Sequence, residues 1–243
     1  MKTVGILQPG YLPWLGFFEQ QLRSEVFVIY DDVQYDKHGW RNRNRIKGSN
    51  GPVWLTVPVR TTGKNKPIIS DVVIDTNQSN WGKRHCGSIK QFYGKTPFFS
   101  DYFYELERVL KCRWVKLMDL NMELIKMLAT WLDVKSNIIF SSQLGCHDDD
   151  PSRRLVEICK ALGADIFYEG AAGRDYLRLE MFDEAEIKVV FQDYRCRIYP
   201  QPYGDFVAHL SAIDVLMNCG PSAKYYVVGN SDMPADHSSL TFT

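Results

Sequence analysis

The sequence contains no long hydrophobic run. No stretch of its 243 residues approaches the roughly 18 consecutive apolar residues that a membrane-spanning helix requires. The amino-terminal region carries Pro9, Pro13, Glu19, Arg23 and Glu25 within its apolar pattern, unlike the uninterrupted apolar core of a signal peptide. We therefore expect no membrane span, no signal peptide and a cytoplasmic location.

Cysteine pairs and an excess of charge of either sign are also absent. The six cysteines are spread singly without a C-x-x-C pair, which excludes zinc ribbons and disulfide scaffolds and fits a reducing compartment. Lys plus Arg (29) equals Asp plus Glu (29), so the formal net charge at pH 7 is zero. A nucleic-acid partner that requires bulk positive charge is disfavoured, whereas a local basic site remains compatible with this composition.

The hydrophobic pattern predicts an α/β fold. A strand over residues 4–8, a Pro/Gly loop at 9–13, a helix over 14–23 and a strand over 26–30 form the βαβ unit of a mostly parallel sheet. The loop at 9–13 would lie at the carboxyl end of its strand, where open α/β sheets bind ligands. We expect a single domain over residues 1–229, with a subdivision near 111–136 as the alternative, and a loose tail over 230–243.

The remaining pattern adds a hairpin insertion, a helical middle and a second α/β half. The hairpin would pair residues 53–59 with 68–74 across a polar turn at 61–66. A final helix over 211–218 would begin with a capping box formed by Ser211 and Asp214. The other expected elements are helices over 81–92, 97–110, 116–132 and 152–162, and strands over 138–140, 166–168 and 188–191.

Several sequence blocks match one known family in content and in order. They are residues 4–18 (VGILQPGYLPWLGFF), 30–35 (YDDVQY), 40–47 (WRNRNRIK), 54–59 (WLTVPV), Trp81 to His85, and 210–216 (LSAIDVL) with Asn218 and Gly220. On these blocks the chain resembles the WbqC-like family. The resemblance implies association with O-antigen and other surface-polysaccharide clusters, near routes to N-acylated and aminoacylated amino sugars. It implies a transferase that acts on a nucleotide-linked sugar.

The segment 31–47 is dense in polar side chains and has no apolar face. Arginines offer planar, bidentate donors to phosphate or carboxylate, asparagines recognise hydroxyls and amides, and a tryptophan stacks on a base or a sugar. A solvated, charge-rich loop is the structural alternative. We predict substrate-binding roles here for Asp31, Gln34, Trp40, Arg41, Asn42, Arg43 and Asn44.

Three other regions contribute candidate substrate-binding residues. The rigid loop that follows the first strand opens a helix whose free N–H groups suit an anion. The G-x-x-G stretch at 170–173 would let backbone amides approach a diphosphate, although this signal is weak alone. The candidates are Gln8, Tyr11 and Trp14 in the first region, Gly170 and Arg174 in the second, and Gln201, Ser211, Asp214 and Asn218 in the last matched block.

Histidine is the side chain best suited to act as a base near neutral pH, and the chain has only five, so candidate catalytic bases are few. We predict His38, His85 and Asp32 as catalytic residues, and His209 also stands beside a matched block. A lone histidine in a helix, such as His85, is more often a packing residue. We predict no metal site, because the run at 147–150 (HDDD) precedes a helix and complements its dipole. We also predict no tightly bound cofactor.

The resulting hypothesis is a transferase of surface-polysaccharide sugar biosynthesis. It would move an acyl or aminoacyl group from a thioester donor, either a phosphopantetheine carrier protein or CoA, to the amine of a nucleotide-linked amino sugar. Such a reaction needs orientation, proton removal and oxyanion stabilisation more than a nucleophile triad. The alternative is a non-catalytic protein that binds a sugar nucleotide or a carrier protein. A glycosyltransferase-like enzyme is a third reading, with Asp31 and Asp32 as its only hint.

Overall fold

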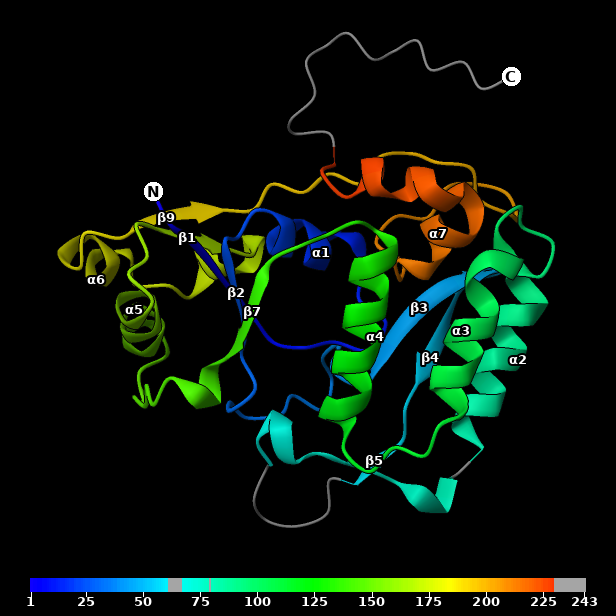
Figure 1. Cartoon of the computed structure of the whole chain (residues 1–243), viewed down its shortest axis with the longest axis horizontal. Coiled ribbons are helices and arrows are strands. Elements are labelled where there is room, and N and C mark those ends of the chain that lie inside the picture. Colours follow the sequence, from blue (N-terminus) through cyan, green and yellow to red (C-terminus); the bar gives the residue numbers. More distant parts are fainter. Residues whose placement is uncertain (61–66, 79, 230–243) are drawn as a thin grey trace, which may run out of the picture.

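The computed structural model describes residues 1–60, 67–78 and 80–229 (Figure 1). The predicted turn at 61–66 and the predicted tail at 230–243 lie outside these residues. None of the helices in the described ranges combines the length and the apolar content that crossing a membrane requires.

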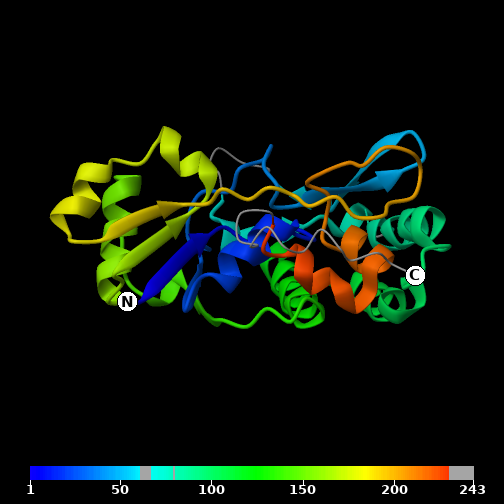
Figure 2. The same cartoon turned by 90° about the horizontal axis from the view of Figure 1, so that it is seen from above.

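A five-stranded parallel sheet forms one end of the elongated molecule (Figure 2). Its strand order is β7-β2-β1-β8-β9, and every neighbouring pair is parallel. Because β7 and β2 lie on one side of β1 while β8 and β9 lie on the other, the chain reverses direction across the sheet at β1. Ligands of open α/β sheets bind outside the strand carboxyl ends at such a reversal. The strands are β1 (Thr3–Leu7), β2 (Val26–Ile29), β7 (Asn137–Phe140), β8 (Ile166–Glu169) and β9 (Lys188–Phe191).

Helices cover both faces of this sheet. Successive side chains of a strand point to opposite faces, so Phe27 and Ile29 join the apolar cluster that contains α1 (Leu15–Leu22) and α4 (Leu117–Trp131). Val26 and Val28 join a second cluster with α5 (Pro151–Ala161) and α6 (Leu179–Glu184). Burial on both faces explains why these strands are nearly continuous apolar runs. The predicted α/β fold with an amino-terminal βαβ unit is confirmed.

The hairpin insertion lies at the other end of the molecule (Figure 2). Its longer pair joins β3 (Arg43–Gly48) to β4 (Gly51–Thr56), within and just after the segment where no strand was expected. The expected pairing of 53–59 with 68–74 is reduced to the two-residue pair of β5 (Val59–Arg60) and β6 (Val73–Ile74). Residues 43–47, at the end of the polar segment 31–47, therefore belong to a hairpin and not to a free loop.

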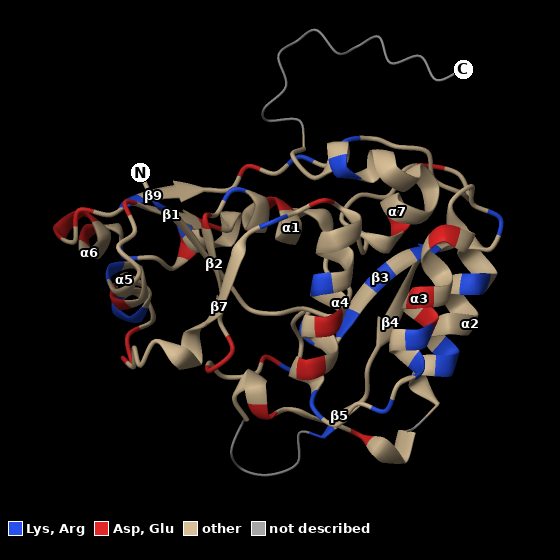
Figure 3. Ribbon diagram, in the orientation of Figure 1, with Lys and Arg blue, Asp and Glu red and all other residues tan. Residues whose placement is uncertain are grey.

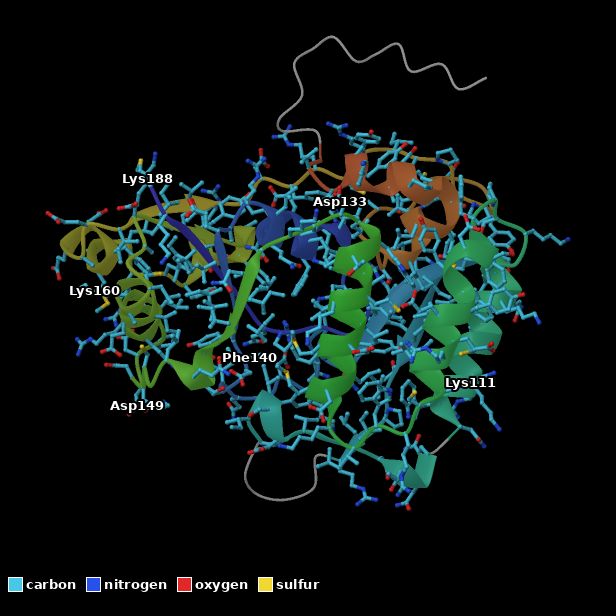
Figure 4. The ribbon with its side chains drawn as sticks, in the orientation of Figure 1. Lys111, Asp133, Phe140, Asp149, Lys160 and Lys188 are labelled. Atoms are coloured by element: carbon cyan, nitrogen blue, oxygen red, sulfur yellow. The ribbon has the colours of Figure 1, made fainter. Side chains whose placement is uncertain are left out.

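The helical middle agrees with its sequence pattern. It contains α2 (Trp81–Tyr93), α3 (Phe99–Lys111) and α4, which is preceded by residues 112–116. Side chains fill the space between these helices and the strands (Figure 4), where Phe140 marks the end of β7 and Lys111 the end of α3. Short 3-10 helices connect the elements: η1 (Ile69–Asp71), η2 (Thr76–Gln78), η3 (Ser141–Gln143), η4 (Ala171–Asp175) and η5 (Gly220–Tyr226).

The capping box expected at residue 211 is not formed. The last α-helix, α7, spans Ile213–Cys219, and no side chain caps its amino terminus. The side chain of Asp214 is fully buried and accepts hydrogen bonds from the Tyr93 hydroxyl at 2.6 Å and the Gln201 amide at 2.7 Å. The carboxylate is directed into the core, so it is unavailable to the helix end.

Candidate functional site

A cavity of about 270 Å³ opens at the carboxyl end of β1, and we call it the β1 cavity. It lies beside the point where the strand order reverses, the place expected for a ligand in this kind of sheet. Five of the predicted substrate-binding residues line it, together with one histidine and apolar walls. The lining residues are Leu7, Gln8, Gly10, Pro13, Trp14, Phe17, Trp40, Arg41, Asn44 and His209.

The loop after β1 is held in place by the polar segment that begins the hairpin. The Asn44 amide donates to the backbone carbonyls of Leu12 at 2.7 Å and Tyr11 at 3.3 Å. The Arg41 guanidinium donates to the carbonyl of Gln8 at 2.9 Å. Leu12 has a φ of 44°, a left-handed conformation that is strained for a branched side chain. Asn44 bonds directly to this strained residue, so the wall of the cavity is fixed.

A third segment, residues 209–212, closes the cavity. Trp14 and Ser211 form an isolated β-bridge, and the backbone N–H of Ser211 donates to the carbonyl of Arg45 at 2.9 Å. The rings of Trp14 and His209 lie 5.1 Å apart. His209 itself has a φ of 57°, a second left-handed residue at the cavity. Segments 7–17, 40–44 and 209–212 therefore meet at one place.

The electrostatics of the β1 cavity depend on Arg41 and His209. Burial lowers the pKa of Arg41 to about 10, so the guanidinium is still charged at neutral pH. Its Nε is buried and has no hydrogen-bond partner among the described residues. Burial and the neighbouring Arg45 lower the pKa of His209 from its ordinary 6.5. The cavity thus combines a cation that has one unpaired N–H donor with an imidazole whose pKa is lowered.

An aromatic platform adjoins the β1 cavity. Trp40 and Trp54 stack with ring centroids 5.1 Å apart, although 43% and 46% of their surfaces are exposed. The guanidinium of Arg43 lies 4.8 Å from the Trp54 ring, and that of Arg45 lies 5.4 Å from the Trp40 ring. Exposed indoles beside cations are suited to a flat ligand such as a nucleobase or a sugar ring.

A second cavity, of about 550 Å³, receives other residues of the same segment. His38, Asn42 and Arg43, all predicted as site residues, line it. We call it the basic cavity, and its lining residues are Tyr35, Lys37, His38, Asn42, Arg43, Thr56, Val57, Pro58, Val59, Gln78 and Arg84. The structure thus distributes eight of the predicted site residues between two cavities.

His85 and Tyr11 are buried and line neither of these cavities. The Tyr11 hydroxyl is 2.8 Å from Nδ1 of His85, and both side chains are buried. Burial lowers the pKa of His85 to about 4, so the ring is neutral at physiological pH. In this position the pair connects the loop after β1 to α2.

Asp31 and Asp32 lie at the carboxyl ends of β2 and β7. Asp31 accepts from the Ser142 hydroxyl at 2.8 Å and the Ser142 backbone N–H at 3.0 Å, and it is bonded to Ser141 as well. Asp32 forms an ion pair of 2.6 Å with Arg154, and both side chains are nearly buried. Both carboxylates are engaged with the fold, away from the two cavities.

The remaining predicted site residues are also distributed outside the two cavities. Gln201 and Asp214 belong to a buried network with Lys47, and Asn218 donates to the Asp214 carbonyl at 2.7 Å. Ser211 is the bridge partner of Trp14. Gln34 forms an isolated bridge with Ile68, Gly170 precedes η4, and the Arg174 guanidinium lies 4.5 Å from the Phe191 ring.

Glu169 is an ionisable residue that sequence reasoning missed. It ends β8, is buried, and accepts from the Tyr176 hydroxyl at 3.0 Å. Burial raises its pKa to about 7. One feature of the sequence could have identified Glu169 as a candidate: it is an acidic residue at the end of an apolar strand, immediately before Gly170.

The acidic run before α5 has a structural role. The Asp150 carboxylate N-caps α5 by accepting from the backbone N–H groups of Ser152 at 3.0 Å and Arg153 at 3.2 Å. Within the described ranges, no group of three His, Cys, Asp or Glu side chains is arranged to hold a metal ion.

Comparison with known proteins adds a family to this geometry. The model of the WbqC-like protein family matches residues 8–226, which include all three segments around the β1 cavity except Leu7. The chain belongs to the WbqC-like family. This WbqC-like chain is 34% identical over 229 residues to the uncharacterized protein Rv1507c of Mycobacterium tuberculosis, covering 93% of the chain and 98% of that relative. No solved structure matches it.

Proposed function

We propose that this WbqC-like protein binds a nucleotide-linked amino sugar in the β1 cavity and transfers an acyl or aminoacyl group to its amine. The observation that carries the proposal is the buried Arg41 Nε without a hydrogen-bond partner at a cavity with aromatic walls. A buried donor left unpaired is costly, and an anionic ligand oxygen would pair it. The family resemblance supplies the class of sugar.

The dimensions of the cavity favour a division of the ligand into two parts. About 270 Å³ is close to the lower limit of small-molecule pockets, which suits a sugar with its adjoining phosphate. The nucleobase would extend over the exposed Trp40 and Trp54 rings, where stacking is favourable. Arg41 would hold a phosphate between these two parts.

The proposed chemistry requires one base. The neutral amine of the sugar attacks the carbonyl carbon of a thioester; a C–N bond forms and the C–S bond breaks. The proton released by the nitrogen passes to His209 and then to the departing thiolate, so no charge is left unbalanced. His209 is suited to this role because it lines the β1 cavity and its lowered pKa keeps it neutral. His38, His85 and Asp32 are the other candidate catalytic residues.

The test is turnover of a 4-amino sugar nucleotide with a panel of acyl-CoA and acyl-carrier donors, followed by mass spectrometry. We expect His209→Gln to lower kcat by roughly 100-fold or more while sugar-nucleotide affinity changes little. His147→Gln, at an exposed histidine that lines neither cavity, is the matched control. If both variants keep full turnover, histidine base catalysis at residue 209 is wrong, and Asp32 and His85 are tested next.

Binding is measured separately by thermal shift with dTDP-sugars and UDP-sugars, because a ligand of the native state raises the melting temperature. Shifts from other ligand classes alone would contradict the sugar-nucleotide assignment. Strong binding of the sugar nucleotide without turnover of any donor would favour the alternative function, a non-catalytic binding protein of the same pathway.

A further inference from the structure

The basic cavity has an unusual balance of charge. Lys37, His38, Arg43 and Arg84 line it, and no acidic residue is among its lining residues. Within the part of the chain that the structure describes, neither Lys37 nor Arg84 forms an ion pair. Arg84 comes from α2 and Arg43 from β3, and Figure 3 shows Lys and Arg segments on both of these neighbouring elements. Cations that converge from two elements without acidic partners favour an anionic ligand.

Arg43 is positioned before any ligand arrives. Its Nε donates to the carbonyl of Gly39 at 3.3 Å, and its Nη2 donates to the carbonyl of His38. Trp54 packs against the guanidinium. Because a guanidinium has five N–H donors, these two bonds fix its orientation and leave donors for a ligand. A fixed guanidinium loses less conformational entropy on binding phosphate than a free one.

Asn42 adds a different requirement at the same cavity. Its Nδ2 donates to the carbonyl of Val57 at 2.8 Å, whereas its Oδ1 is buried and has no partner among the described residues. This oxygen would accept from an N–H or O–H group. The cavity therefore suits a ligand that carries both an anion and a hydrogen-bond donor, such as an amide or a hydroxyl near a phosphate.

The two cavities share one stretch of backbone. Trp40, Arg41 and Asn44 line the β1 cavity, while Asn42 and Arg43, between them in the sequence, line the basic cavity. Two ligands could thus bind on either side of residues 40–44. The basic cavity is also the larger, at about 550 Å³.

We propose that the basic cavity binds the phosphate end of a phosphopantetheine arm, the part common to CoA and to an acyl carrier protein. The amides and the hydroxyl of the arm would supply the donor that Asn42 lacks, and Lys37, Arg43 and Arg84 would hold the phosphate. The identity of this ligand as the donor rests on the proposed function. The presence of a separate anion site rests only on the cavity.

The experiment is isothermal titration of the full chain with four probes: 4′-phosphopantetheine, phosphate-free pantetheine, 3′,5′-ADP and CoA. Arg84→Gln removes one lining cation, and Lys83→Gln removes the neighbouring charge on α2, which does not line the cavity. We expect 4′-phosphopantetheine to bind about tenfold to a hundredfold more weakly to Arg84→Gln and unchanged to Lys83→Gln, since one charge-assisted contact is lost. Lys37→Gln, at another exposed lining residue, serves as a second variant.

The probes also distinguish the two sources of the arm. Binding of 3′,5′-ADP that depends on Arg84 would assign the donor to CoA, whereas binding of 4′-phosphopantetheine without 3′,5′-ADP would assign it to a carrier protein. The proposal is overturned if pantetheine binds as tightly as its phosphate, if no probe binds, or if Arg84→Gln and Lys83→Gln behave alike.

Titration with a dTDP-sugar on the same preparations separates this proposal from the proposed function. Loss of dTDP-sugar binding in Arg84→Gln, with no effect on 4′-phosphopantetheine, would assign the basic cavity to the acceptor and overturn the proposal. In the opposite outcome, 4′-phosphopantetheine binds in a way that depends on Arg84 and no dTDP-sugar binds. That outcome would contradict the function proposed for the β1 cavity and would support the anion site in the basic cavity.

Discussion

Within the polar segment 31–47, the two aspartates at its start and the arginine and asparagine at residues 41 and 42 have opposite uses. In the first half, the Asp31 carboxylate is surrounded by hydroxyl and N–H donors, and Asp32 is paired with Arg154. In the second half, Arg41 and Asn42 line cavities and each keeps a buried polar atom without a partner among the described residues. Polar density alone therefore does not identify a site. Unused hydrogen-bonding capacity beside a cavity is the more informative property.

The largest expected effect comes from the first half. Arg154→Met would leave Asp32 as a buried carboxylate without its cation, which typically costs about 3 to 5 kcal/mol. We expect a loss of this size in the free energy of urea unfolding. The neighbouring Arg153→Met is the control, since Arg153 is exposed and should change stability by less than about 0.5 kcal/mol. Equal effects of the two substitutions would show that the Asp32 pair does not stabilise the fold.

Glu169 provides a carboxylate at the same edge of the sheet with fewer partners than Asp31. Its pKa is raised from 4.5 to about 7 by burial, so the folded protein keeps a proton that the unfolded chain releases between these values. Stability contributed by this group therefore falls as pH rises from 4.5 to 7. A pKa difference of 1 between the folded and unfolded states corresponds to about 1.4 kcal/mol of stability. Glu169→Gln should therefore be more stable than the parent by about 3 kcal/mol at pH 8.

The measurement is urea unfolding of both proteins at pH 5 and pH 8. We expect the stability advantage of Glu169→Gln to be small at pH 5 and to grow toward pH 8. An advantage independent of pH would mean that Glu169 titrates at its ordinary value in the folded protein.

The smallest expected effect on stability comes from the second half. Arg41→Lys keeps the charge at the β1 cavity but loses the planar fork that holds the Gln8 carbonyl and that we propose binds the ligand. We expect sugar-nucleotide affinity to fall about tenfold, or roughly 1.4 kcal/mol, with a loss of about 1 kcal/mol or less in stability. Arg60→Lys on β5 is the control. A large fall in stability with unchanged affinity would assign Arg41 to the fold, like Asp32.

The parallel sheet was predictable because its strands are buried on both faces and read as apolar runs. The β3–β4 hairpin was not, for a physical reason. Along the first four residues of β3 the buried positions alternate with partly buried ones, but Asn44 occupies one of the buried positions, and the buried Lys47 then breaks the alternation. The Asn44 amide donates to the carbonyls of the loop after β1, so this polar residue is stable at a core position. The sequence therefore lacks the alternation of apolar and polar residues that would predict a strand here.

Five of the residues that line the β1 cavity could be named from the sequence, but the separation of the predicted residues 38–44 into two cavities could not. Asn42 and Asn44 differ by two positions and contribute to different cavities. Likewise, Asp214 fitted a local capping pattern, and only the tertiary position of Tyr93 on α2 shows why its side chain points into the core. These distinctions depend on contacts between segments that lie 15 to 121 residues apart in the sequence.

The order in which the chain leaves the ribosome has a consequence for this arrangement. Strands β1 and β2 and the helix between them are complete within the first 30 residues, but β1 gains its second neighbour, β8, only after residue 166. The wall of the β1 cavity formed by His209 follows later still. Contacts of such long sequence separation form slowly, because loop closure precedes the gain in contact energy. Nascent chains that end between residues 192 and 208 therefore contain all five strands of the sheet but lack the His209 wall of the cavity, and we expect them not to bind the ligand proposed for it.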